Sequence, residues 1–120
     1  MNNQWIVVYY HNRRGERVVR DEIEAFGLDN AAKITSVINL LERFGLNLRG
    51  RFVKHVEGKI WELRVDSYRV LYFAFQQHRF VILRAFMKKT DKTPGKEIRI
   101  AWNRLQDYII RFKEIDDEKR

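Results

Sequence analysis

The chain has 120 residues, of which 45% are hydrophobic and 33% are charged, so composition indicates one globular domain rather than a disordered chain. It has no cysteine, which excludes disulfide bonds and thiolate metal sites, and its three histidines lack metal-ligand spacing, so we expect neither metal nor cofactor. The formal net charge of +8 favours a polyanionic partner, either nucleic acid or an acidic protein.

The first half of the chain predicts one strand and two helices. Residues 5–10 (WIVVYY) are β-branched or aromatic, and because this strand is apolar on both faces we expect it to pair inside a sheet. After a polar loop, apolar residues recur at helical spacing over residues 16–26 and 30–44. Gly27 and Gly45 are placed to end these helices, and Asp29 to cap the second. We expect the helices to form a hairpin whose apolar stripes cover the sheet: Val19, Ile23, Phe26, Ile34, Val37, Ile38, Leu41 and Phe44.

The second half predicts a sheet followed by a helix. Residues 52–56 favour a short strand, and Gly58 separates it from three apolar runs between residues 60 and 88, which indicate a three-strand antiparallel meander. Thr93 is typical of a helix N-cap and Pro94 of the first helical position, and the helix should reach Phe112, followed by a charged tail over residues 113–120. The expected fold class is α+β: an antiparallel sheet of the N-terminal strand and the meander, packed by an N-terminal helical hairpin, with a C-terminal helix, in one domain over residues 1–120.

The two turns of the meander predict which side chains lie opposite each other. A tip at Asp66–Ser67 places Arg64 opposite Arg69, and a tip at Gln77–His78 or at residues 76–79 places Phe75 opposite Phe80. Alternation then divides the side chains between two faces. One face carries Arg64, Arg69, Arg84, Phe86 and Lys88 near one end and Phe73, Phe75, Phe80 and Ile82 near the other. The opposite, core face carries Trp61, Leu63, Val65, Val70, Tyr72, Ala74, Val81, Leu83, Ala85 and Met87.

The charged end of the first face needs a counter-charge. Like charges directly opposite in a sheet are destabilising, so Arg64, Arg69 and Lys88 require a carboxylate or an anionic ligand among them. Glu62 lies on the same face and can neutralise part of this charge. Spacing alone leaves two interpretations open, a solvated basic edge paired with Glu62 or a phosphate-binding site.

Four motifs carry a resemblance to a known family: a W-E-L-R strand, a Y-R-V-x-Y-F strand, a K-K-T-x-K-T-P loop and an A-x-x-R-x-x-D-Y helix. With them, over almost the whole chain, the sequence resembles the HigB-like, phage-derived branch of the RelE/ParE toxin superfamily. The resemblance implies a RelE-like microbial RNase fold and the toxin of a type II toxin–antitoxin system. It further implies a metal-independent endoribonuclease that cleaves mRNA on the ribosome. The implied partners are mRNA, the ribosome and a cognate HigA-like antitoxin with a helix-turn-helix domain, with operator DNA bound only through the antitoxin complex.

The same resemblance assigns roles to residues. It implies that Arg69, Lys88 and Lys89 are catalytic and that Arg64 and Lys92 bind RNA. The sequence departs from the RelE pattern at Ile60 and Glu62, where a lysine pair is expected, and at Thr93–Pro94, where a tyrosine is expected.

The residues themselves suggest how these roles would be shared. Arg69 would clamp the scissile phosphate through its planar guanidinium, and Lys88 or Lys89 would transfer a proton. His55 is a further candidate for proton transfer, because histidine exchanges protons near neutral pH. Arg64, Lys54 and Lys92 would hold flanking phosphates, and His55 is placed with them among the RNA-binding residues.

Two other functions remain open at this point. A ParE-like gyrase poison would share the fold, and a non-catalytic basic module would only bind an antitoxin or nucleic acid. Tyr108 and Ile110 fall off the apolar stripe of the last helix and are candidate partner contacts. No apolar run is long enough to span a membrane and the N-terminus lacks a basic segment before its short apolar run, so we expect a cytoplasmic location.

Overall fold

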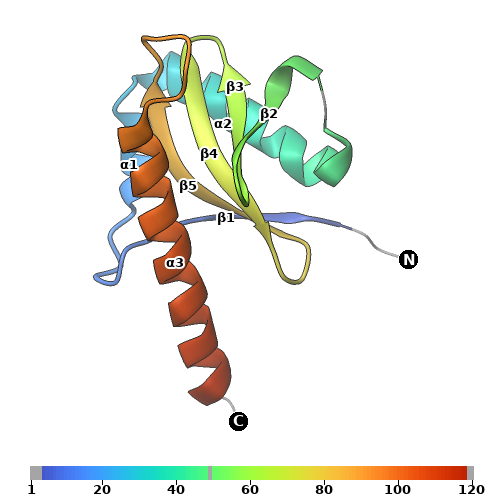
Figure 1. The fold of residues 1–120 in the computed structure, drawn as a ribbon. Helices are drawn as coiled ribbons and strands as arrows, with labels where there is room; N and C mark the ends of the chain where they lie inside the picture. The colour runs from blue at the N-terminus through green and yellow to red at the C-terminus, as the bar shows by residue number, and fades with distance from the viewer. Residues whose placement is uncertain (1–3, 49, 119–120) are drawn as a thin grey trace.

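The computed structural model describes residues 4–48 and 50–118. Its elements are β1 (Ile6–Tyr9), α1 (Val18–Glu24), α2 (Leu28–Phe44), the 3-10 turns η1 (Gly45–Asn47) and η2 (Gly50–Phe52), β2 (Val53–Glu57), β3 (Ile60–Val65), β4 (Tyr68–Phe75), β5 (Arg79–Met87) and α3 (Gly95–Glu118). The sheet lies between α2, which packs behind it, and α3, which crosses its front (Figure 1). The α+β class and the helix–sheet arrangement are confirmed. In the part of the chain that the structure describes, no helix is long and apolar enough to cross a membrane.

The sheet order is β1-β5-β4-β3-β2. The pairs β2–β3, β3–β4 and β4–β5 are antiparallel, and β1 is parallel to β5. Two expectations for the first strand are wrong, because β1 is an edge strand rather than an interior one, and it pairs parallel rather than antiparallel with its neighbour β5. Its apolar character has another cause. The side chains of Val7, Val8 and Tyr9 are half-buried, and Glu42 of α2 accepts a hydrogen bond at 3.1 Å from the Val7 backbone amide on the outer side of the strand. Thus a side chain of α2 satisfies one backbone donor of this sheet edge.

The register of the first hairpin is as predicted, but that of the second changes along its length. Arg64 pairs with Arg69 and Arg69 pairs with Phe86, as expected. At the other end Phe75 pairs with Arg79 rather than Phe80, because the loop has three residues and two of them adopt left-handed backbone conformations, with φ of 63° at Gln77 and 53° at His78. A β-bulge with Leu83 as the extra residue restores the register near Arg69. Phe80 and Ile82 therefore share a face with Tyr72, and Val81 shares one with Phe73, the reverse of the prediction.

Side chains from both neighbouring helices satisfy the backbone at the bulge. Arg104 of α3 donates to the Leu83 carbonyl oxygen at 2.8 Å, and Glu22 of α1 accepts from the Ala85 amide at 3.1 Å. Arg84 bridges the two helices through Glu22 and Glu97, at 2.7 Å each. The bulge is thus where α1, β5 and α3 are joined.

The hydrophobic core lies on both sides of the sheet. The α2 residues Ile34, Ile38 and Leu41 are buried as predicted, but Phe44 is 47% exposed. Ala101 and Leu105 of α3 are buried.

Three details of the α3 prediction are wrong. Tyr108, expected to be free for a partner, packs edge-on against Phe73 and Phe75. The helix continues through Glu118, so most of the expected tail is helical, while residues 119–120 lie outside the described residues. Thr93 does not cap α3, because its hydroxyl donates to Glu62 and the Pro94 carbonyl accepts the first helical hydrogen bonds.

The helix α2 also starts differently from the prediction. It begins at Leu28, directly after Gly27, which has φ of 93°. Asp29 therefore lies in the first turn rather than at the cap, where its charge still complements the helix dipole.

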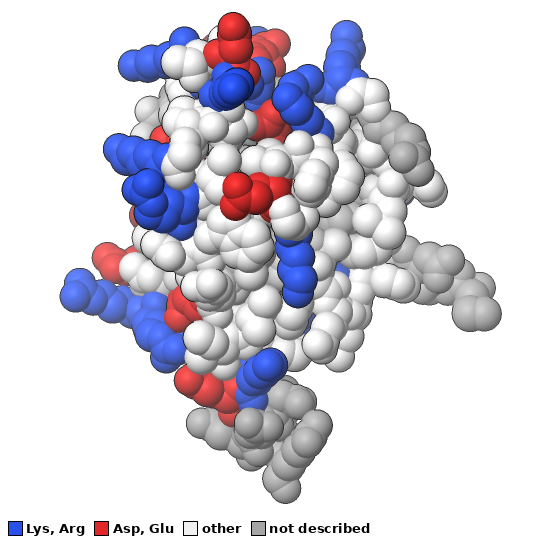
Figure 2. All heavy atoms as spheres, viewed as in Figure 1, with Lys and Arg blue, Asp and Glu red and all other residues white. Residues whose placement is uncertain are grey.

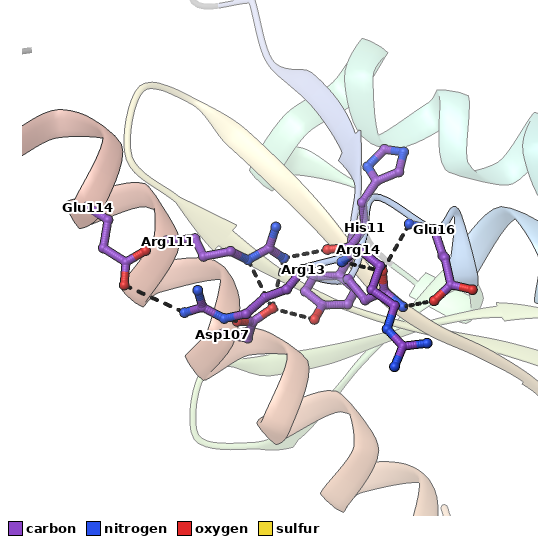
Figure 3. Close-up of polar contacts among 9 residues, drawn as sticks. His11, Arg13, Arg14, Glu16, Asp107, Arg111 and Glu114 are labelled. Atoms are coloured by element: carbon purple, nitrogen blue, oxygen red, sulfur yellow. Dashed lines mark hydrogen bonds and ion pairs between the residues drawn. The ribbon is translucent and has the colours of Figure 1, made fainter. Parts of the chain in front are cut away.

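A polar network attaches the loop after β1 to α3 (Figure 3). The Tyr10 hydroxyl donates to Asp107 at 2.5 Å, Arg13 donates to Asp107 at 3.0 Å, and Arg111 bonds both Asp107 and the His11 carbonyl oxygen. Glu114 adds an ion pair to Arg13 at 3.6 Å. The far half of α3 is therefore held by charge as well as by its apolar face.

Candidate active site at the basic end of the sheet

A buried carboxylate lies between the two opposed arginines. Glu62 has no exposed surface, and its Oε2 atom lies 3.3 Å from Arg64 Nε and 3.8 Å from Arg69 Nε. Its other oxygen accepts a hydrogen bond at 2.7 Å from Thr93, in the loop before α3. Glu62 thus supplies the counter-charge that the predicted Arg64–Arg69 pairing requires, and it fastens the lysine-rich loop to the sheet.

The guanidinium of Arg69 is held at the β3–β4 turn. Its Nη1 atom donates to the carbonyl oxygens of Asp66 and Tyr68, at 2.8 Å each. The side chain is 15% exposed, and its Nε atom is buried without a hydrogen-bond partner among the described residues. Arg69 is therefore a rigid cation, held by two carbonyl oxygens and ion-paired with Glu62, and a planar guanidinium fixed in this way suits binding of an oxyanion.

Arg64 and Arg69 line an open groove of about 660 Å³ at the end of the sheet. Pairing of β2 with β3 ends at Val53 and Leu63, so η2 occupies the space beside the last residues of β3 and faces α2. Four cationic side chains and one carboxylate line the groove, together with a serine and three apolar residues: Lys33, Ser36, Val37, Arg51, Phe52, Arg64, Val65, Asp66 and Arg69. Such a surface suits a chain of phosphates. Our reading of the sequence missed Lys33 and Arg51, although the basic character of residues 47–59 was a signal for Arg51.

The structure separates the three loop lysines. The Lys88 backbone amide donates to the Ser67 carbonyl oxygen at 2.7 Å, which fixes Lys88 beside the turn that holds Arg69. Lys89 lines a different hollow, between α1 and the start of α3. Lys92 is exposed, and its carbonyl oxygen accepts a hydrogen bond from the Thr90 hydroxyl at 2.8 Å.

The two candidates in β2 lie on opposite faces of the sheet. Lys54 is exposed and pairs in register with Glu62, so it lies on the Arg64 face. His55 pairs in register with Trp61, its Nε2 atom donates to the Gly58 carbonyl oxygen at 2.8 Å, and its ring lies edge-on to the Trp61 ring. The structure thus brings Lys54 toward the cluster but not His55.

Arg84 also belonged to the predicted basic face, but its surroundings are acidic. Burial alone would lower the pKa of its guanidinium, but Glu97 and Glu22 outweigh this effect and raise the pKa. Both carboxylates contact Arg84 at 2.7 Å, so this arginine has a structural role and is not available to a ligand.

The family model of phage-derived Gp49-like proteins (DUF891) matches residues 21–106, which include α2, the whole meander and the first half of α3. The chain belongs to the Gp49-like family. None of the curated proteins matches it. Among solved structures, the toxin–antitoxin complex RelBE2 from Mycobacterium tuberculosis contains a chain of similar fold. That chain is 20% identical, with a TM-score of 0.53, and the match covers 71% of this chain and 99% of the other.

The family model confirms the phage-derived branch of the recognition made from the sequence motifs, and the structural match confirms the RelE-like fold. In this Gp49-like chain, basic and acidic side chains lie side by side at the end of the molecule where the β3–β4 turn and the loop before α3 lie, and further basic side chains lie along the side formed by α3 (Figure 2). The site therefore combines a fixed arginine, a second arginine, a nearby lysine and a buried carboxylate. This arrangement can bind and polarise a phosphodiester.

Proposed function

We propose that this Gp49-like chain is the toxin of a type II toxin–antitoxin system and a ribosome-dependent mRNA endonuclease. The observation that carries the proposal is the position of Arg69, fixed at a turn, opposite Arg64 and on the wall of a cationic groove. The RelBE2 structure is a toxin–antitoxin complex with the same fold, which supports an antitoxin as the partner. We further propose that this antitoxin is HigA-like, that operator DNA is bound only through the antitoxin complex, and that the toxin acts in the cytoplasm.

The proposed reaction is attack of a ribose 2′-oxygen on the adjacent phosphorus. A base removes the 2′-hydroxyl proton, the phosphorus–5′-oxygen bond breaks, and an acid protonates the leaving 5′-oxygen. The products are a 2′,3′-cyclic phosphate and a 5′-hydroxyl end. Arg69 holds the phosphate and stabilises the charge that builds up on its oxygens, and Arg64 adds a second positive charge. Loss of one such contact typically raises the barrier by about 3–4 kcal/mol.

Lys88 is the side chain that we assign to proton transfer. Its backbone is fixed beside the turn that positions Arg69, so its flexible side chain starts from the same end of the sheet. Lys89 lines the hollow between α1 and α3, and we assign it a supporting role with Lys92 and Lys54 in binding flanking RNA. His55 donates to Gly58 on the other face, and we assign it no part in proton transfer.

The test is cleavage of a reporter mRNA in a reconstituted translation reaction by the wild type, Arg69→Ala and Arg69→Lys. We expect both variants to lose about a hundredfold or more in rate, because lysine keeps the charge but not the planar fork. The matched control is Arg99→Ala, which removes an exposed arginine of α3 and should leave the rate unchanged. Circular dichroism establishes that each variant is folded. Cleavage at the wild-type rate by folded Arg69→Ala would contradict the assignment.

A further inference from the structure

We propose that the groove beside Arg69 is a nucleotide subsite for single-stranded RNA. The phosphate of one nucleotide lies on Lys33, Arg51 and Arg64, and its base lies against Phe52. This inference deepens the proposed function and rests on it only in naming RNA as the strand, because the groove can be tested by binding alone.

The charges of the groove come from separate elements that meet only in the folded chain. Lys33 projects from α2, Arg51 from η2 and Arg64 from β3, so three cations surround the same space. Lys33 and Arg51 are exposed, and the Arg64 side chain is 34% exposed. Cations from three directions match a phosphate, which presents oxygens in several directions.

The groove also has an apolar wall. Phe52 is half-buried, and the half-buried Val37 and the buried Val65 lie beside it. The guanidinium of Arg51 lies 5.3 Å from the centre of the Phe52 ring, which helps to hold this ring in place. An aromatic ring beside phosphate-binding cations is the arrangement by which proteins bind single-stranded nucleic acid, with bases stacked on the ring and the backbone on the cations.

One acidic side chain of the groove lining, Asp66, opposes this use of the groove, in addition to the buried Glu62 that pairs with Arg64 from outside the lining. Asp66 lies 3.6 Å from Lys33, and both side chains are more than 60% exposed, at 69% and 63%, so their ion pair is weak and readily exchanged for a phosphate. Removing the Asp66 charge should therefore strengthen RNA binding. Asp66 has φ of 53°, and asparagine is among the residues that tolerate this conformation, so Asp66→Asn should keep the turn.

The experiment measures binding of a fluorescent 2′-deoxy oligonucleotide, which lacks the hydroxyl that the proposed cleavage requires. Fluorescence anisotropy over a series of salt concentrations gives the affinity and its salt dependence. We expect Lys33→Ala and Arg51→Ala to weaken binding about tenfold each and to reduce the slope of log K against log salt by about 0.7 each, the value for one phosphate contact on a single strand. The matched control is Lys113→Ala, an exposed lysine of α3 distant in sequence from the groove, which should change neither quantity.

Two further variants test the stacking of a nucleobase on Phe52 and the opposing charge of Asp66. Phe52→Leu keeps an apolar side chain but removes the stacking surface, and it should weaken binding about tenfold without changing the salt slope. Asp66→Asn should bind more tightly than the wild type. If Lys33→Ala and Arg51→Ala behave like Lys113→Ala, or Asp66→Asn binds no more tightly, the subsite is overturned. If binding follows these expectations but no RNA is cleaved, the subsite stands and the proposed endonuclease function fails.

Discussion

Glu62 is a fully buried carboxylate that contacts two arginines and a threonine. Without it, Arg64 and Arg69 would face each other across two strands with no counter-charge. When one partner of a buried ion pair is removed, the loss of folding free energy exceeds the net contribution of the intact pair, because the remaining charges stay desolvated. Glu62 therefore allows a cationic pair to exist where a phosphate can later bind.

We predict that Glu62→Ala lowers the free energy of unfolding by about 3 kcal/mol and that Glu62→Gln lowers it less, because glutamine can still accept the Thr93 hydrogen bond. Urea unfolding at neutral pH measures both. The comparison variant is Glu24→Ala, which breaks the exposed ion pair with Arg17 and should cost less than about 1 kcal/mol.

Stabilisation by inorganic phosphate gives a second test of the Arg64–Arg69 pair. If the arginines accept an anion in place of Glu62, added phosphate should stabilise Glu62→Gln more than the wild type. Equal stabilisation of both proteins would speak against an anion site at these arginines.

At the scale of single residues, the sequence predicted which residues pair in the first hairpin better than it predicted what surrounds each side chain. The Asp66–Ser67 turn was sufficient to place Arg64 opposite Arg69, because a two-residue tip determines the register of its hairpin. Tyr108 was misassigned, since helical periodicity alone does not show that the aromatic residues Phe73 and Phe75 lie beneath it.

Among the elements, one carboxylate joins the second half of α3 to the end of β1 and the loop that follows it. Asp107 accepts hydrogen bonds from Tyr10, Arg13 and Arg111 (Figure 3). Burial alone would raise the pKa of the Asp107 carboxyl, but these partners outweigh it and hold the pKa below its ordinary value. A pKa that is lower in the folded than in the unfolded chain means that the charged carboxylate stabilises the fold.

We predict that Asp107→Asn lowers the free energy of unfolding by about 1–2 kcal/mol at pH 7. The stabilisation by Asp107 is complete above its unfolded pKa of about 4 and is lost as the pH falls through the folded pKa. The difference between wild type and variant should therefore shrink as the pH is lowered below about 4. Urea unfolding over a pH series measures this difference. Glu114→Gln, on the same helix and with a 54% exposed side chain, should show little effect, and a pH-independent difference for Asp107→Asn would contradict the account.

The order and type of the elements were predictable, because period-2 and period-3.6 apolar patterns are distinct. The bulge at Leu83 was not, since residues 80–83 are all apolar and fit either register, and the extra residue is stabilised by Arg104 and Glu22 from other elements. The edge position of β1 was hidden for a similar reason. Its side chains from Val7 to Tyr9 are half-buried on both faces of the sheet, so its composition resembles that of an interior strand.

For the whole molecule, the net charge of +8 indicated a polyanionic partner, but its distribution required the fold. The sequence predicted that Arg64, Arg69 and Lys88 lie close together, because they belong to one meander. The sequence could not predict that Lys33 and Arg51 lie beside them, since these residues come from a helix and a 3-10 turn whose packing is not local in sequence. For the same reason, His55 was included although it lies on the other face of the sheet.

The most direct test of the account is to induce the wild type and Arg69→Ala in cells and map mRNA 5′ ends within minutes. The proposed function predicts new 5′ ends inside coding regions with the wild type and none with Arg69→Ala at equal expression. Growth arrest with intact mRNA would contradict it, and DNA damage in those cells would then identify a gyrase poison on the same fold.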